Sequence, residues 1–268
     1  MASTTPNPLV VDIHTHIFPP HFIEDRARLS GSDAAFGEMY GSARAQMATA
    51  EDLIASMDAA GVDVAVAAGF WWRDRARRGE HAAYLLASAL RYPDRIVPFV
   101  PQSAGDALPG AAGRGEVRVA DPASLDVDDL PILVHCSEEV GHAYPGKPGG
   151  LTPGALWRLL DAQPGARVIA AHWGGGFPFY ALMPEVRTVI EAGRLVFDTA
   201  ASSLLYAPEA VRRGLDLAGA GAVCWGSDFP LRDQAADRAL IEAALPDPAE
   251  RAAVLGGNAV RFLDLRRE

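Results

Sequence analysis

Short apolar runs alternate with amphipathic segments along most of the chain. The apolar runs have the length of strands, and the amphipathic segments have the length and cap residues of helices. Strands are expected at residues 9–13, 62–68, 96–100, 132–136, 167–171, 195–198 and 222–225. Helices are expected at residues 49–60, 80–91, 153–161, 182–192, 208–218, 235–244 and 248–264. This alternation predicts an α/β fold in which helices cover both faces of a parallel sheet.

The number of repeats favours a closed barrel. An eighth strand is expected at residues 116–119, and eight repeats in 268 residues suit a single (β/α)8 TIM-barrel domain over residues 1–268, since this fold typically takes about 250 residues. Residues 101–131 leave little room for two crossovers and a strand, because one crossover usually needs about a dozen residues or more. We therefore expect shortened connections around 101–131, with an outer wall that something such as a second subunit would cover.

Composition and charge limit the classes of partner that this chain is expected to bind. The formal net charge is −10, so the phosphates of nucleic acid would be repelled. The sequence has neither a signal-peptide pattern nor an apolar run of 18 residues, which argues against a membrane partner. Cys136 and Cys224 lie inside expected strands and are interpreted as buried thiols of a reduced, cytoplasmic protein. A small-molecule substrate and a homodimer are the associations that we expect.

Two histidines lie at the end of the first expected strand. Side chains alternate along a strand, so Asp12, His14 and His16 should share one face while Ile13 and Thr15 share the other. A lone histidine is more often a hydrogen-bonded core residue. A His-x-His pair at the C-terminal end of a parallel strand is a stronger indication of a metal site, because both imidazoles can reach one ion.

Three more residues occupy equivalent places. His135 and His172 each end an expected strand, and Asp228 follows another, and active sites of barrel enzymes are built from those strand ends. Each taken alone has the ordinary interpretation of a hydrogen-bonded core or loop residue. Taken together, imidazoles and a carboxylate from several strands indicate a site for Zn²⁺ or a similar ion.

Several segments resemble the amidohydrolase superfamily, specifically its amidohydrolase-2 branch. They are residues 12–19 (DIHTHIFP), 135–138 (HCSE), 171–176 (AHWGGG), 225–230 (WGSDFP) and 255–262 (LGGNAVRF). The resemblance implies a metal-dependent barrel enzyme with one divalent ion, usually Zn²⁺, with Mn²⁺ as the alternative. The residues that match its ligands are His14, His16, His135 and Asp228. His172 matches the histidine that lies beside the ion and helps to activate water or substrate.

Members of this family differ in their chemistry, so three functions stay open. The first is hydrolysis of a small carboxylated or cyclic amide or ester substrate by a metal-activated water, with Asp228 accepting a proton and His172 orienting or protonating the oxygen. The second is non-oxidative decarboxylation, as in aminocarboxymuconate semialdehyde decarboxylase, with His172 or Asp228 protonating carbon. The third is a catalytically inactive barrel that acts as a binding partner, which the shortened 101–131 region suggests.

A carboxylate on the expected fourth strand raises the question of a second ion. Many binuclear relatives carry a bridging carboxylated lysine or a glutamate at the end of that strand. Glu116 is the only carboxylate on residues 116–119, but it stands at the start of that range. A salt bridge between Glu116 and a nearby arginine is therefore the simpler expectation.

Polar and aromatic residues near the strand ends are candidates for binding substrate. Residues 141–147 (GHAYPGK) resemble the start of a phosphate-binding loop, but Pro145 removes a backbone N–H and Pro148 replaces the usual Ser or Thr, so a loop at the barrel mouth is expected instead. Arg73 would clamp a substrate carboxylate, with a surface pair to Asp74 as the alternative. The substrate-binding candidates are Arg73, Trp72, Glu138, His142, Tyr144 and Trp173.

Overall fold

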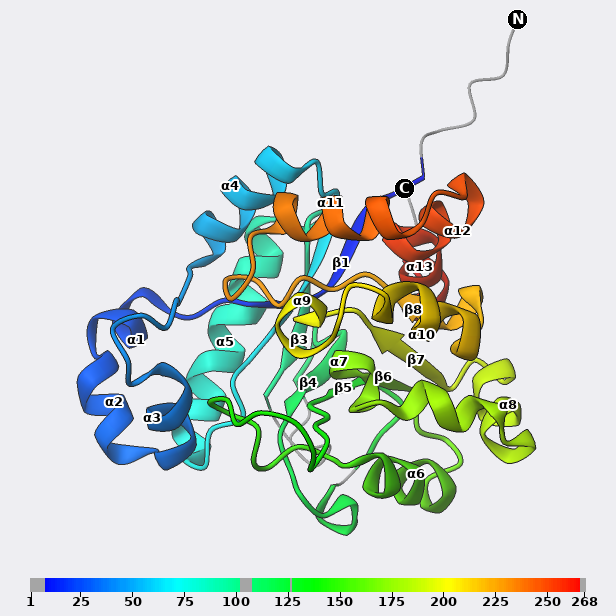
Figure 1. The fold of residues 1–268 in the computed structure, drawn as a ribbon. Helices are drawn as coiled ribbons and strands as arrows, with labels where there is room; N and C mark the ends of the chain where they lie inside the picture. Colours follow the sequence, from blue (N-terminus) through cyan, green and yellow to red (C-terminus); the bar gives the residue numbers. More distant parts are fainter. Residues whose placement is uncertain (1–7, 102–107, 126, 266–268) are drawn as a thin grey trace, which may run out of the picture.

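Eight parallel strands form the centre of the computed structural model, which describes residues 8–101, 108–125 and 127–265 (Figure 1). The strands are β1 (Val11–His16), β2 (Val64–Ala68), β3 (Ile96–Val100), β4 (Gly113–Val117), β5 (Ile132–Val134), β6 (Val168–Ala170), β7 (Leu195–Asp198) and β8 (Val223–Cys224). Each strand pairs with the next one along the chain. The segment after β8 closes the barrel onto β1, since the amide of Ile13 donates to the carbonyl of Trp225 at 3.0 Å and Thr15 bridges to Phe229. The predicted (β/α)8 barrel is confirmed.

Helices surround the strands. The α-helices are α1 (Pro20–Glu24), α2 (Arg26–Ser32), α3 (Ala34–Tyr40), α4 (Ala50–Ala60), α5 (Arg75–Arg91), α6 (Pro153–Ala162), α7 (Ala171–Gly174), α8 (Pro184–Glu191), α9 (Ser202–Leu205), α10 (Ala210–Ala218), α11 (Gln234–Ala244), α12 (Pro248–Ala252) and α13 (Asn258–Leu263). The remaining helical turns are η1 (Pro122–Ser124), η2 (Phe177–Leu182), η3 (Ala220–Ala222) and η4 (Ala253–Gly257), of which the first three are 3-10 and η4 is π-helical. The sequence pattern did not predict α1–α3, which gather at one side of the barrel (Figure 1). None of the helices that the structure describes has the length and hydropathy needed to span a bilayer.

Local sequence signals fix the ends of the best-predicted helix. Thr49 accepts from the amide of Asp52, and the Asp52 side chain accepts from the amide of Thr49, so α4 begins with a capping box. Gly61 adopts φ 65° at its C-terminal end, in the left-handed region that glycine enters without steric cost. Both residues act as the sequence predicted.

The core has two layers. Alternate residues of the strands, such as Val11, Val66 and Leu133, fill the barrel interior together with Phe262 of α13. The other face of the strands, with residues such as Ala65 and Val134, packs against the surrounding helices. Both faces of a parallel sheet are therefore removed from water, which explains the near-continuous apolar runs in the sequence.

The region 101–131 contains no α-helix among the residues that the structure describes there, 102–107 and 126 lying outside them. Between β4 and β5, η1 is the only helical turn among the described residues. The buried side chain of Leu125 packs into the outer layer with Val117 and Ile132. The shortened connections are confirmed, and Leu125 covers part of this wall from within the chain. The homodimer stays a prediction.

The fourth strand begins three residues earlier than expected and ends two residues earlier. It runs over Gly113–Val117. The sequence pattern did not reveal its start, because two of its residues are glycines, which have low strand propensity. A Cβ atom at Gly113 would lie 2.3 Å from the Phe99 ring, and one at Gly115 would lie 2.7 Å from the Leu133 carbonyl oxygen. Packing inside the barrel thus requires glycine where propensity disfavours it. In consequence, Glu116 lies near the end of the strand, where a ligand residue would belong, and not at its start.

A buried histidine links α1–α3 to the barrel. His81 of α5 donates from Nε2 to the carbonyl of Ile17 at 2.7 Å, and its Nδ1 accepts from Trp72 Nε1 at 3.1 Å. Its ring stacks on Phe18 in a cluster of aromatic side chains. Burial lowers the pKa of His81 to about 4, so the ring is neutral at pH 7.

Acidification is expected to destabilise the fold through His81. Its folded pKa lies below the unfolded value of about 6.5, so its contribution is fully present above about pH 6.5 and is lost as the pH falls toward 4. Between pH 7 and pH 5 this amounts to about 2 kcal/mol. Urea unfolding of the wild type and His81→Gln at both pH values measures the difference. The variant should lose less free energy of unfolding over this interval, and equal losses would show that His81 is not the titrating group.

Candidate metal and active site

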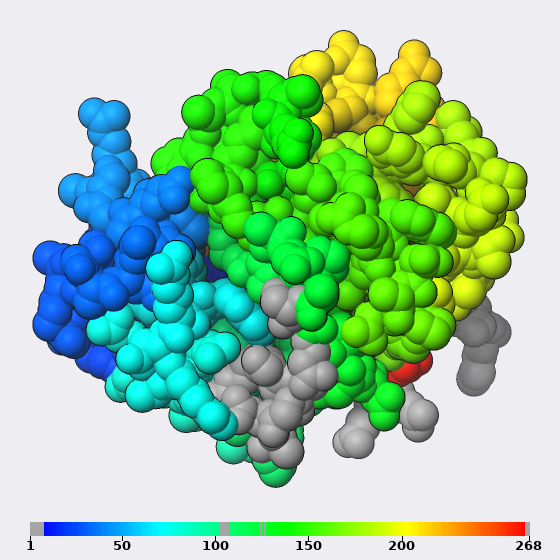
Figure 2. Space-filling model, turned by 90° about the horizontal axis from the view of Figure 1, so that it is seen from below, coloured from blue at the N-terminus to red at the C-terminus, as the bar shows by residue number. Residues whose placement is uncertain are grey.

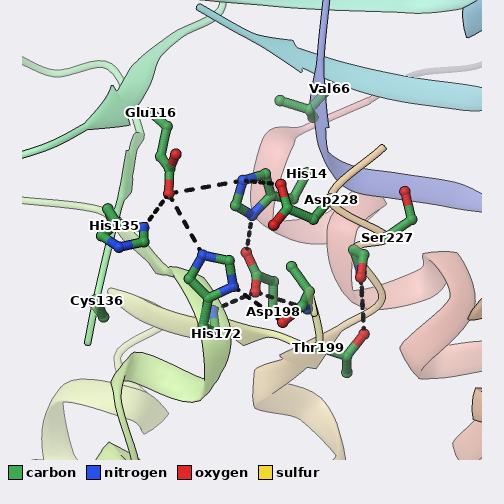
Figure 3. A network of polar contacts seen from close by, with 12 residues as sticks. His14, Val66, Glu116, His135, Cys136, His172, Asp198, Thr199, Ser227 and Asp228 are labelled. Carbon is green, nitrogen blue, oxygen red and sulfur yellow. Dashed lines mark hydrogen bonds and ion pairs between the residues drawn. The ribbon is translucent and has the colours of Figure 1, made fainter. Parts of the chain in front are cut away.

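Histidines and carboxylates from six strands meet at the C-terminal mouth of the barrel (Figure 3). β1, β4 and β7 carry some of them, and others directly follow β5, β6 and β8. All are buried. They are His14, His16, Glu116, His135, His172, Asp198 and Asp228. Histidine and carboxylate ligand atoms lie within 4.8 Å of one another in two adjoining sets, His14–His16–Asp228 and Glu116–His135–His172. The five strand-end residues predicted from sequence are thus brought together.

A bulge in β1 turns the His-x-His pair inward. Asp12 pairs with Ala65 and Thr15 with Ala67, so β1 uses one residue more than β2 over this interval. Ile13 belongs to the barrel interior and His14 joins the site, whereas the Asp12 carboxylate accepts from Gln234 of α11 at 2.8 Å. The expectation that Asp12 shares a face with both histidines, opposite Ile13, is therefore wrong, because strict alternation holds only without a bulge.

A second bulge places Glu116. Arg114 pairs with Ile132 and Val117 with Val134, so β4 again has one residue more than its neighbour. Val117 faces the outer layer, and the Glu116 side chain points into the site toward His14, His135 and His172 (Figure 3).

The Nδ1 atom of every histidine in the site is held by an acceptor. His14 Nδ1 is 2.7 Å from Asp198 Oδ2, and His135 Nδ1 is 2.7 Å from Glu116 Oε1. His16 and His172 reach the backbone carbonyls of Ala68 and Ala200 at 3.2 and 3.1 Å. Because these oxygens only accept, each Nδ1 carries the hydrogen and a neutral ring keeps its lone pair on Nε2.

The Nε2 atoms form a donor set that fits a divalent metal ion. His14 Nε2 lies 3.1 Å from His16 Nε2, and Asp228 Oδ1 lies 3.7 and 3.3 Å from these two nitrogens. His135 Nε2 is buried and has no hydrogen-bond partner among the described residues. Two lone pairs 3.1 Å apart repel unless positive charge lies beside them, and an orphaned buried nitrogen is costly. A cation bound by imidazole nitrogens and a carboxylate removes both problems.

The electrostatics of the site favour positive charge at its centre. Burial alone would lower the pKa of His14, but Asp198, Asp228 and Glu116 together raise it to about 10. Burial would likewise raise the pKa of Asp228, yet the neighbouring histidines hold it well below its usual range. Burial and the charge of Arg118 lower the pKa of His135 to about 4, which keeps its Nε2 lone pair available.

Glu116 contacts all four imidazoles. Beyond its hydrogen bond to His135, its carboxylate oxygens lie 3.7 to 3.9 Å from the Nε2 atoms of the other three histidines, and Arg118 Nη1 lies 3.7 Å from its Oε2. The expected arginine pair is therefore present. Glu116 also lies among the candidate metal ligands, where the alternative role of a bridging ligand would place it.

Backbone conformations with positive φ orient two of the side chains in the site. His172 and Asp228 have φ values of 56° and 64°, a region that residues other than glycine enter rarely and mostly at functional sites. The Asp198 carboxylate accepts from the amide of His172 at 2.7 Å and so stabilises its turn. Asp198 was missed by sequence analysis, although it ends an expected strand and the same positional rule would have found it. A Cβ atom at Gly226 would lie 2.9 Å from the Cβ of His14, so only glycine fits there.

A cavity of about 370 Å³ opens above these residues. His16, Glu116, His135, His172 and Asp228 line its base. Its apolar and aromatic wall includes Met39, Tyr40, Leu204, Leu205 and Leu231. Of the substrate-binding candidates, His142 and Tyr144 line it.

The other substrate-binding candidates lie outside this lining. Trp72 and Trp173 are buried and donate to His81 and Ser202, respectively, as core aromatics do. The Arg73 side chain is exposed, and Glu138 accepts from the hydroxyl of Tyr206 at 3.4 Å. For these four residues, the contacts in the described structure fit a structural or surface role better than contact with a substrate in this cavity.

A barrel whose strand ends gather histidines and carboxylates under a cavity has the architecture of barrel enzymes. Residues 123–265, more than half of the chain, match the amidohydrolase family. The chain belongs to this family and is an enzyme of the amidohydrolase superfamily. No curated protein matches the sequence.

Solved structures with the same fold are similar over nearly their whole length. One is 5-carboxyvanillate decarboxylase from Novosphingobium aromaticivorans with manganese and 4-hydroxy-3-methoxy-5-nitrobenzoic acid, at 16% identity and TM-score 0.73, covering 96% of each chain. Another is dihydroxybenzoic acid decarboxylase from Polaromonas sp. JS666 with manganese and 2-nitroresorcinol, at 14% identity and TM-score 0.67, covering 97% of this chain and 98% of the other. A third is a probable 2-pyrone-4,6-dicarboxylic acid hydrolase from Acinetobacter baumannii with citric acid bound, at 13% identity and TM-score 0.60, covering 97% and 100%.

Proposed function

We propose that the chain is a metal-dependent decarboxylase that releases CO₂ from a small aromatic carboxylate without oxidation. The observation that carries the proposal is the cavity, whose base is the histidine–carboxylate cluster and whose wall is largely apolar and aromatic. Such a wall suits a planar ring, and a divalent ion at the base suits its carboxylate. The similar decarboxylase structures, which hold manganese and substituted aromatic ligands, support this choice over the hydrolase that the sequence suggested first.

In this proposal one ion is held by the Nε2 atoms of His14, His16 and His135 and by Asp228. Asp198 and the Ala68 carbonyl fix the rings of His14 and His16 through their Nδ1 atoms. The mixed nitrogen and oxygen donors suit both Zn²⁺ and Mn²⁺. When bound, the ion supplies Lewis acidity toward the oxygens of the substrate.

His172 supplies the proton that the reaction consumes. Its Nδ1 donates to the Ala200 carbonyl, so the imidazolium form of His172 carries its transferable proton on Nε2, which faces Glu116 and the cavity. The bond between the ring and its carboxylate carbon breaks and its electron pair stays on the ring carbon. The proton then moves from Nε2 to that carbon, which leaves CO₂ and a ring C–H without any oxidant.

Hydrolysis of a cyclic ester is the second candidate. The similarity to the probable pyrone dicarboxylic acid hydrolase favours it, as do Asp228 and Glu116, two buried carboxylates that can accept a proton from water. The inactive barrel is the third, but a complete donor set at the strand ends argues against it.

A substrate panel tests the proposal. Protein loaded with Mn²⁺ or Zn²⁺ is given 2,6-dihydroxybenzoate, 5-carboxyvanillate, 2-pyrone-4,6-dicarboxylate and simple lactones, and both CO₂ and ring-opened products are measured. We expect metal-dependent CO₂ release from at least one aromatic carboxylate. Ring opening without CO₂ release would assign the hydrolase function instead.

A further inference from the structure

Arg118 is a cation of the cavity that the proposed chemistry does not use. It directly follows β4, and its side chain is only 8% exposed. Arg44 also lines the cavity, but it is exposed to solvent. Burying a guanidinium costs desolvation free energy unless the group meets negative charge or acceptor oxygens. The groups around Arg118 therefore indicate what it binds.

The guanidinium is held from two sides. Its Nη2 donates to the carbonyl of Gly146, and the amide of Gly146 donates to Glu38 Oε1 of α3 at 3.2 Å. This contact joins the loop after β5 to α3, and Figure 2 shows the blue surface of the N-terminal helices beside the green surface of the middle of the chain. Gly146 has φ 84°, and a Cβ atom there would lie 2.9 Å from Arg118 Nη2. Glycine at position 146 thus leaves room for the Arg118 guanidinium.

Most of the hydrogen-bonding capacity of Arg118 remains available. A guanidinium has five N–H donors, and the Gly146 carbonyl takes one. The Glu116 carboxylate lies 3.7 Å from Nη1, which is too far for a hydrogen bond, and it is shared with four imidazoles. The other donors have no acceptor among the residues that the structure describes.

A second hydrogen-bond donor in the cavity also lacks an acceptor. The hydroxyl oxygen of Tyr144 is buried and lacks a hydrogen-bond partner within the described chain. Tyr144 lies two residues before Gly146 and lines the same cavity as Arg118. Arg118 and Tyr144 thus have hydrogen-bond donors without acceptors in one cavity. Such donors complement an anionic oxygen group, and a planar guanidinium matches a carboxylate in particular.

We infer that Arg118, assisted by Tyr144, binds a second carboxylate of the substrate, so that the site selects aromatic dicarboxylates over monocarboxylates. This specificity role rests on the proposed function, in which the first carboxylate lies at the metal-binding base. Arg118 thereby sets the substrate class and leaves the bond-breaking step to the residues below it.

Binding of unreactive probes tests the inference without turnover. Calorimetric affinities of benzoate and isophthalate are measured on Mn²⁺-loaded wild type, Arg118→Met and Arg118→Lys, with Arg44→Met as the matched control for an exposed arginine of the same cavity. We expect wild type and Arg44→Met to prefer isophthalate by about 10- to 100-fold, which is the range for hydrogen bonds to a charged group. Arg118→Met should lose this preference, because its isophthalate affinity falls by that factor more than its benzoate affinity, and Arg118→Lys should keep part of it.

Metal content and thermal melting of each variant identify a misfolded one. If Arg118→Met does not fold, Tyr144→Phe replaces it, and a preference for isophthalate reduced several-fold is then expected. Equal affinities of both probes for the wild type, or a preference that survives in Arg118→Met, would overturn the inference. CO₂ release from monocarboxylates alone would overturn it and leave the proposed function intact. An Arg118-dependent preference for isophthalate without CO₂ release from any substrate would support the inference and contradict the proposed function.

Discussion

Replacing His172 by Asn is expected to lower activity by about 10²- to 10⁴-fold, the range for loss of a general acid or base, with metal content near that of the wild type. Asparagine lacks a proton that it can transfer, but His172 is not among the proposed ligands. His14→Asn is the matched variant, because it removes an Nε2 that lies 3.1 Å from His16 Nε2 and 3.7 Å from Asp228. It should lose both metal and activity. Metal per subunit and turnover of the best panel substrate measure the two effects.

The pair of variants distinguishes two arrangements. His172 also belongs to the set formed with Glu116 and His135, which has the composition of a second metal site. If His172 were a ligand there, its variant would lose metal as well. Equal metal loss in His172→Asn and His14→Asn would therefore contradict its role as the proton donor beside a single ion.

Glu116→Gln is expected to weaken metal binding by about 10- to 100-fold, the usual cost of losing a partner that orients a ligand. Glutamine keeps the size of the side chain but removes the charge that faces four imidazoles and holds His135 Nδ1 at 2.7 Å. The wild type should contain one ion per subunit. Competition with a chelator measures the affinity, and elemental analysis measures the stoichiometry.

Glu138→Gln is the control for this experiment, because Glu138 lies outside the cavity lining and should leave metal affinity unchanged. Two ions per wild-type subunit, with one lost in Glu116→Gln, would instead make Glu116 a bridging ligand. Unchanged affinity in Glu116→Gln would assign the carboxylate to its pair with Arg118 alone.

The sequence by itself determined the barrel and most of the metal-binding candidates. Alternating strand and helix patterns are local, and parallel strands bring their carboxyl ends to one mouth, so His135, His172 and Asp228 could be placed together without coordinates. The cap residues Thr49 and Gly61 are equally local, because each acts on the backbone of its own helix end.

Only the tertiary structure decided the position of Glu116 and the face of Asp12. Bulges in β1 and β4 insert one residue each, and a bulge reverses the alternation on which a face is predicted. The glycines of β4 are dictated by Phe99 and Leu133, which are distant in sequence, so strand propensity could not reveal that strand. Whether an aromatic side chain such as Trp72 or Tyr144 packs in the core or faces the cavity likewise depends on the neighbours that the folded chain brings to it.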